Sequence, residues 1–144
     1  MNKTINSQGL ILTLKNQHRA LQADLSLVLE KIEVGGLGDE IVLNLTKFKN
    51  DLLEHLKLEN ETFYPDYLEK KIKRGEEVDT TKKFIKEMDE IGKVVIGFLE
   101  KYATAETISK SLLEFKKELI SIINTLNMRI ESEEDGVFGL YLLL

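Results

Sequence analysis

The chain has 144 residues, a length that suits one domain, so we predict a single domain over residues 1–144. It is 42% hydrophobic and 31% charged, which is typical of a globular protein with its own core and excludes a disordered chain. The net charge of −5, without a basic cluster, argues against nucleic-acid binding, and the absence of cysteine excludes disulfides and thiolate metal sites.

The N-terminal part of the sequence does not read as a targeting segment. It leads into only a short apolar run, residues 10–12, without a small-residue cleavage site. No apolar run approaches the roughly 20 residues that span a bilayer. We therefore expect a cytoplasmic protein that does not bind membranes.

Apolar residues in steps of three and four predict a first helix over residues 7–34. The glycine-rich segment 34–38 ends this helix, and Asp39 is a candidate cap for the second helix. The apolar stripe of the second helix continues to Phe63. We expect Pro65 to kink or end that helix, because proline lacks a backbone donor and clashes with the preceding turn.

A polar, lysine-rich segment over residues 70–77 separates the two halves of the chain. It could be a docking patch, although a solvated helix end and loop is the more common origin of such a charge run. A third helix is predicted after the capping residues 79–81, and a fourth helix begins at Thr104 or Thr107. Four helices of this length with short links predict an all-α fold, an antiparallel up-down-up-down four-helix bundle.

The two halves of the sequence repeat each other at a shift of 74 positions. Apolar stripe residues of the first half fall on apolar stripe residues of the second half. The shift also relates three polar positions: His18 falls on Gly92, His55 on Arg129 and Glu59 on Glu133. The pattern indicates a duplicated two-helix unit whose second copy lacks the histidines.

Five polar residues fall on the apolar stripes of the predicted helices: His18, His55, Glu59, Arg129 and Glu133. The up-down topology would bring them to one level of the core. Burying an isolated charge costs several kcal/mol, so such groups should be paired or should bind a metal ion. His55 and Glu59 are one helical turn apart, and imidazole with carboxylate is a ligand mixture for Fe, Zn or Mn.

Packing without a metal is an equally supported interpretation of the two histidines at this point. Arg129 could pair with Glu133 or Glu59 and neutralise these carboxylates without a metal. Tyr64 could orient a ligand or approach the site, although packing at the end of the second helix is the more common role for such a residue. Three further carboxylates near the site are assigned to solvated helix faces: Glu90, Glu131 and Glu134.

At these residues the chain resembles the hemerythrin-like, or HHE cation-binding, family. The family pattern is a histidine on helix 1, His-x-x-x-Glu with an aromatic residue and often proline on helix 2, a histidine on helix 3, and His-x-x-x-Glu on helix 4. His18 matches the first part and residues 55–65 match the second. Glu133 and Phe138 match the fourth part, so the resemblance covers nearly the whole chain.

The departures from the family pattern concern one of two metal ions. In the family, the ions share carboxylates from helices 2 and 4, and each takes histidines from one half of the chain. The residues for the first ion are all present: His18, His55, Glu59 and Glu133. Gly92 and Arg129 replace the histidines of the second ion, and arginine cannot ligate a cation because it is permanently charged. The resemblance therefore implies at most one ion, iron or zinc, and argues against a dinuclear oxygen carrier.

Three functions are compatible with these residues. The first is a degenerate hemerythrin-like domain that binds one metal ion and senses metal or oxygen. The second is a metal-free bundle in which Arg129 replaces the lost metal and which serves as an interaction or regulatory module, with another protein or a second copy of the chain as its candidate partner. An enzyme has the least support, because the sequence shows no substrate-binding motif, phosphate loop or activated nucleophile. The sequence does not choose between the first two.

Overall fold

The computed structural model describes residues 6–36 and 38–144, and within these residues it contains helices and no β-strand. The four longest helices are α1 (Ser7–Glu33), α2 (Gly38–Leu58), α4 (Asp79–Lys101) and α6 (Leu112–Ser132). Three shorter α-helices are α3 (Tyr64–Lys73), α5 (Ala105–Lys110) and α7 (Phe138–Leu142). Two π-helical segments are η1 (Glu59–Phe63) and η2 (Glu133–Val137).

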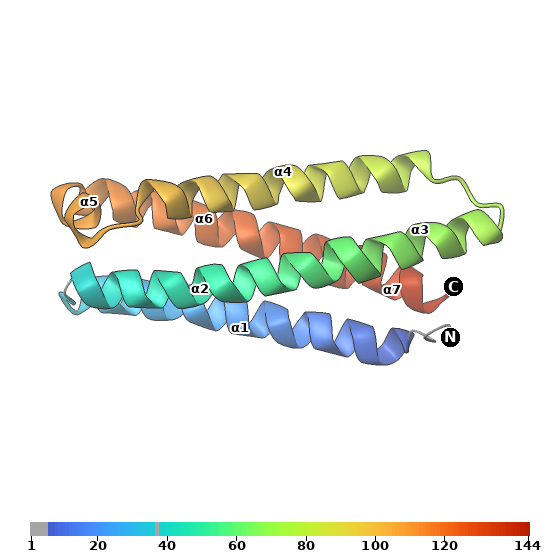
Figure 1. Ribbon diagram of the computed structural model, residues 1–144, viewed down its shortest axis with the longest axis horizontal. Coiled ribbons are helices and arrows are strands. Elements are labelled where there is room, and N and C mark those ends of the chain that lie inside the picture. Colours follow the sequence, from blue (N-terminus) through green and yellow to red (C-terminus); the bar gives the residue numbers. More distant parts are fainter. Residues whose placement is uncertain (1–5, 37) are drawn as a thin grey trace.

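The long helices lie side by side along the molecule (Figure 1). Each of α1, α2, α4 and α6 runs opposite to the one before it. Helix α3 continues along the line of α2, and α7 continues along the line of α6, so each pair forms one row of the bundle. Helix α5 lies at the opposite end of the bundle from α7. The predicted all-helical bundle is confirmed, and its rows are divided into more elements than the four predicted helices. No helix of the described residues is both long enough and apolar enough to cross a lipid bilayer.

Two apolar clusters form the core of the bundle. The larger cluster surrounds Phe48 and Phe115, and the smaller surrounds Phe63, Phe138 and Tyr141. A fully buried side chain of this size contributes about 1.5–3 kcal/mol relative to an exposed one, so the clusters supply most of the stabilisation. The polar stripe residues lie where the two clusters meet along the bundle.

Each π-helical segment begins at one of the two stripe glutamates. Glu59 starts η1 and Glu133 starts η2, so the same local irregularity occurs at corresponding positions of the two halves. Single π turns inside α-helices are frequent at functional sites. Pro65 follows η1 in the first turn of α3, where a missing N–H is tolerated. Pro65 therefore does not end the helical row, which continues as α3. The interruption of the regular α-helix is a π turn that precedes the proline.

The connections agree in part with the predicted caps. Thr104 caps α5 by accepting a hydrogen bond from the backbone N of Thr107 at 3.2 Å, as expected for a helix start. Helix α4 differs, because the Glu77 carboxylate accepts from the backbone N of Thr80 at 2.8 Å. Most of the lysine-rich segment 70–77 is exposed and forms the end of α3 and a loop.

Candidate metal centre

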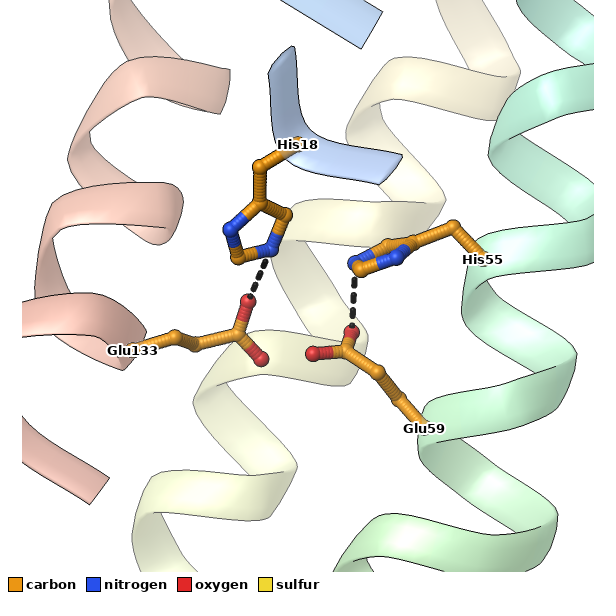
Figure 2. Close-up of side chains that lie close together, drawn as sticks. All are labelled: His18, His55, Glu59 and Glu133. Atoms are coloured by element: carbon orange, nitrogen blue, oxygen red, sulfur yellow. Dashed lines mark hydrogen bonds and ion pairs between the residues drawn. The ribbon is translucent and has the colours of Figure 1, made fainter. Parts of the chain in front are cut away.

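The four predicted metal ligands come together in the core (Figure 2). His18 comes from α1, His55 from α2, Glu59 from the start of η1 and Glu133 from the start of η2. All four are buried, and one ligand atom from each lies within 4.8 Å of the others. They converge because each of the four residues faces the core from its own helix and all four lie at the same level of the bundle.

Each histidine turns its Nε2 atom toward a carboxylate (Figure 2). His18 Nε2 lies 3.1 Å from Glu133 Oε1, and His55 Nε2 lies 3.2 Å from Glu59 Oε1. Ligand atoms that share one ion at about 2.1 Å are separated by roughly 3.0–3.4 Å when their bonds meet at about 90–110°. Both spacings are therefore suitable for neighbouring ligands of a single ion.

Tyr64 contacts the site directly. Its hydroxyl donates a hydrogen bond to Glu133 Oε2 at 2.6 Å, and its side chain is buried. Burial, together with the charges of Glu133 and Glu59, raises the pKa of the Tyr64 phenol well above its usual value, so the phenol remains a donor. Tyr64 therefore has both of the roles considered for it, because the ring packs on Phe63 while the hydroxyl reaches the site.

Arg129 makes the predicted contact with the carboxylates. Its Nη2 donates to Glu59 Oε1 at 2.5 Å, and its Nε lies 3.8 Å from Glu133 Oε1. Its Nη1 donates to the backbone oxygen of Met88 at 2.8 Å. Burial lowers the pKa of Arg129, but the charges of Glu59 and Glu133 outweigh this effect and raise the pKa overall, so the guanidinium stays charged.

Gly92 provides the space that the guanidinium needs. A Cβ atom at this position would lie 3.2 Å from Arg129 Nη1, which is tighter than most side-chain contacts. A pocket of about 220 Å³ lies between α2 and α4, and its lining includes Leu56, Gly92, Ile96 and the α6 residue Arg129. Positions 92 and 129 are therefore neighbours in the core, and the guanidinium of Arg129 occupies part of the space beside Gly92.

The comparison with protein-family models identifies the family of this chain. A model described as Hemerythrin HHE cation binding domain matches residues 10–141. The chain belongs to this family. Neither the search of curated proteins nor the search of solved structures found a significant match. The family's description names cation binding, and this hemerythrin-like domain contains a His/Glu cluster that could hold a metal ion.

The electrostatics of this hemerythrin-like domain distinguish its two histidines. Burial lowers the pKa of His18, but the hydrogen bonds and charges of Glu133 and Glu134 outweigh burial and raise the pKa overall. Burial and the neighbouring His18 lower the pKa of His55 to about 3, so His55 is neutral. Burial and the charge of Glu59 raise the pKa of Glu133 to about 7. The carboxylates are thus faced by the charged guanidinium of Arg129 and by the neutral imidazole of His55.

Two features of the hemerythrin-like site fit a metal ion. Among the described residues, the buried Oε2 atom of Glu59 has no hydrogen-bond partner, which is uncommon for a carboxylate in a protein core. The Nδ1 atom of His55 lies 2.7 Å from Gln17 Oε1, so Nδ1 carries the proton and Nε2 turns a lone pair toward Glu59. Arg129 donates to the Glu59 oxygen that faces His55, but His55 Nε2 and Glu59 Oε2 are left without a donor. An ion bound by His55 Nε2 and Glu59 would satisfy both groups.

Other polar contacts of the hemerythrin-like site were not predicted. Glu134 was assigned to a solvated face, yet it is only 19% exposed and its Oε2 lies 2.6 Å from His18 Nδ1. The apolar stripe does not single out Gln17, which lies one position off it. Glu90 and Glu131 are exposed, as expected for solvated faces. The signal that could have revealed Gln17 and Glu134 is their sequence position directly beside a ligand, His18 and Glu133 respectively.

Proposed function

We propose that this hemerythrin-like domain binds one metal ion, iron or zinc, through His18, His55, Glu59 and Glu133 on an antiparallel four-helix framework. The supporting observation is the buried, unpartnered Oε2 of Glu59 within a set of ligand atoms that all lie within 4.8 Å of one another. Two imidazoles and two carboxylates supply four ligands, and water can complete the coordination of either metal.

The function we propose for this ion is metal or oxygen sensing. The ligands come from α1, α2, η1 and η2, so an ion bound to all four would tie separate rows of the bundle together. Binding to the folded state alone stabilises that state by mass action, by about 2.7 kcal/mol when the free ion is at 100 times its dissociation constant. An iron ion would also supply reactivity toward oxygen, whereas zinc would not. Metal occupancy would thus be reported as bundle stability.

The second candidate is a metal-free interaction or regulatory module in which Arg129 replaces the lost metal. The observation that favours it is the 2.5 Å contact between Arg129 and Glu59, together with the hydrogen bond from Tyr64 to Glu133. These contacts compensate much of the buried negative charge without any ion. The partner would be another protein or a second copy of the chain. For both candidates we keep the expectation of a cytoplasmic location.

Metal analysis of the protein purified without chelator separates the two candidates. We expect at most one iron or zinc ion per chain, and loss of that ion in the double variant His18→Ala/His55→Ala. The exposed variant Glu131→Gln should retain the ion, and circular dichroism should show equal helicity in all three proteins. An ion that survives the double histidine change would refute the ligand assignment. A metal-free wild-type protein with intact helicity, even after incubation with Fe²⁺ or Zn²⁺, would support the module.

A further inference from the structure

Both histidines of the site are held at the nitrogen that faces away from Glu59 and Glu133. His55 Nδ1 contacts Gln17 Oε1 at 2.7 Å, and His18 Nδ1 contacts Glu134 Oε2 at 2.6 Å. Each Nε2 atom, in contrast, faces a glutamate of the candidate centre. An oxygen acceptor at Nδ1 keeps the proton on that atom and leaves the Nε2 lone pair available.

The acceptor for His18 belongs to a longer chain of polar contacts. Arg19 Nη2 forms an ion pair with Glu134, and Arg19 Nη1 donates to Gln22 Oε1 at 3.0 Å. Gln22 Nε2 in turn donates to Asn127 Oδ1 at 3.0 Å. This chain joins α1 to α6 and η2. Glu134 is therefore fixed from outside by a residue adjacent to the histidine that it contacts.

The acceptor for His55 is Gln17, which comes from the same turn of α1 as His18. Gln17 precedes His18 in α1, and its side chain reaches across to His55 of α2. Residues 17–19 thus act on both rings: the first contacts His55, the second is itself a histidine of the site, and the third holds Glu134. The two imidazole rings lie 4.7 Å apart in an edge-to-face arrangement that these contacts fix.

We propose that Gln17 and Glu134 are positioning residues that set the tautomer and orientation of His55 and His18 for metal binding. This inference rests on the proposed function, because it assigns a role toward the same ion. Outer partners of metal-bound histidines orient the ring and make the ligand nitrogen more basic, and their loss typically weakens metal affinity about 10–100-fold. Neither residue would touch the ion itself.

Variants that keep or remove the acceptor oxygen test the proposal by titration with Zn²⁺ and Fe²⁺. Gln17→Leu and Glu134→Leu should each weaken binding about 10–100-fold. Glu134→Gln should keep near wild-type affinity, since its amide oxygen still accepts from Nδ1 while its charge equals that of the leucine variant. Gln17→Glu likewise keeps an acceptor. The exposed residues Gln8 and Glu131, changed to leucine, serve as controls and should bind like the wild type.

Nuclear magnetic resonance of the metal-free protein adds a readout that is independent of affinity. The chain has two histidines, so the imidazole nitrogen signals can be assigned with one histidine variant. We expect His55 to carry its proton on Nδ1 in the wild type. In Gln17→Leu the proton should move to Nε2, which then donates to Glu59. An unchanged tautomer in Gln17→Leu would overturn the role of Gln17.

The two measurements separate this inference from the function on which it rests. If the wild type binds metal and the leucine variants at 17 and 134 bind equally well, the positioning role is wrong and metal binding stands. If the wild type binds no metal, the proposed function fails, and the tautomer of His55 still decides whether Gln17 orients the ring. If Glu134→Gln loses as much affinity as Glu134→Leu, then charge and not the acceptor contact is responsible, which would overturn the role of Glu134.

Discussion

Replacing Arg129 with methionine removes the guanidinium and keeps most of the side chain's apolar volume. The side chain is 4% exposed, and its Nη2 lies 2.5 Å from Glu59, which is fully buried. Without metal, the change leaves a buried carboxylate facing a second one. Breaking a buried ion pair by removing one partner costs about 3–5 kcal/mol. We expect a loss of this size in the free energy of unfolding of the metal-free protein.

Urea denaturation followed by circular dichroism measures this loss, with Arg19→Met as the matched control. Arg19 is 56% exposed, and surface ion pairs contribute about 0–1 kcal/mol, so the control should lose no more than that. Adding Glu59→Gln to Arg129→Met should recover much of the stability, because the unpaired charge is then absent. If Arg129→Met costs no more than the control, Arg129 does not neutralise the site, and the reasoning from burial and distance is refuted.

Four further outcomes are expected from the same structure. Gly92→Ala should raise the free energy of unfolding by about 1 kcal/mol in an Arg129→Met background. In the wild type the gain should be smaller, because the new Cβ would press on the guanidinium. Equal effects in both backgrounds would show that the two positions are not coupled. The double change Gly92→His with Arg129→His should raise metal binding to two ions per chain, and a count that stays at one or fewer would mean that these positions are not the lost ligands. Tyr64→Phe should lower the free energy of unfolding by about 1–3 kcal/mol, because a buried carboxylate loses its donor. The control is Tyr102→Phe, which should be close to neutral in the same assay, because the hydroxyl of Tyr102 has no hydrogen-bond partner among the described residues. Burial and a neighbouring carboxylate raise the pKa of Asp24 to about 6, so the folded state holds this proton more tightly than the unfolded state. The stability that this group contributes should therefore fall as pH rises from about 4 through about 6. Asp24→Asn should flatten that part of the profile of unfolding free energy against pH.

The helical rows and the convergence of the four candidate ligands could be predicted from the sequence because both follow from periodicity. Core positions recur every three to four residues, so a histidine or glutamate in phase with leucines must point inward. His18 and Glu133 were found in this way. The same rule predicted that Arg129 would reach the carboxylates, since it is four residues before Glu133 on one helix face.

The contacts around the histidines could not be predicted because they depend on how neighbouring helices are rotated against each other. Gln17 lies beside the stripe and contacts His55 on another helix, which no spacing within α1 reveals. The two π turns also leave no periodic signal of their own, since they add a residue to one turn of a continuing helix. The side chain of Tyr64 lies at the end of one such turn, where the usual helical phase no longer indicates its direction.

Anomalous X-ray diffraction from crystals grown with Fe²⁺ or Zn²⁺ tests the central claim most directly. The account predicts one strong peak per chain, within bonding distance of the Nε2 atoms of His18 and His55 and of oxygens of Glu59 and Glu133. It also predicts no second peak beside Arg129, because the guanidinium is permanently charged and cannot ligate a cation. A structure with no peak between the four side chains, or with two ions in the core, would contradict the account.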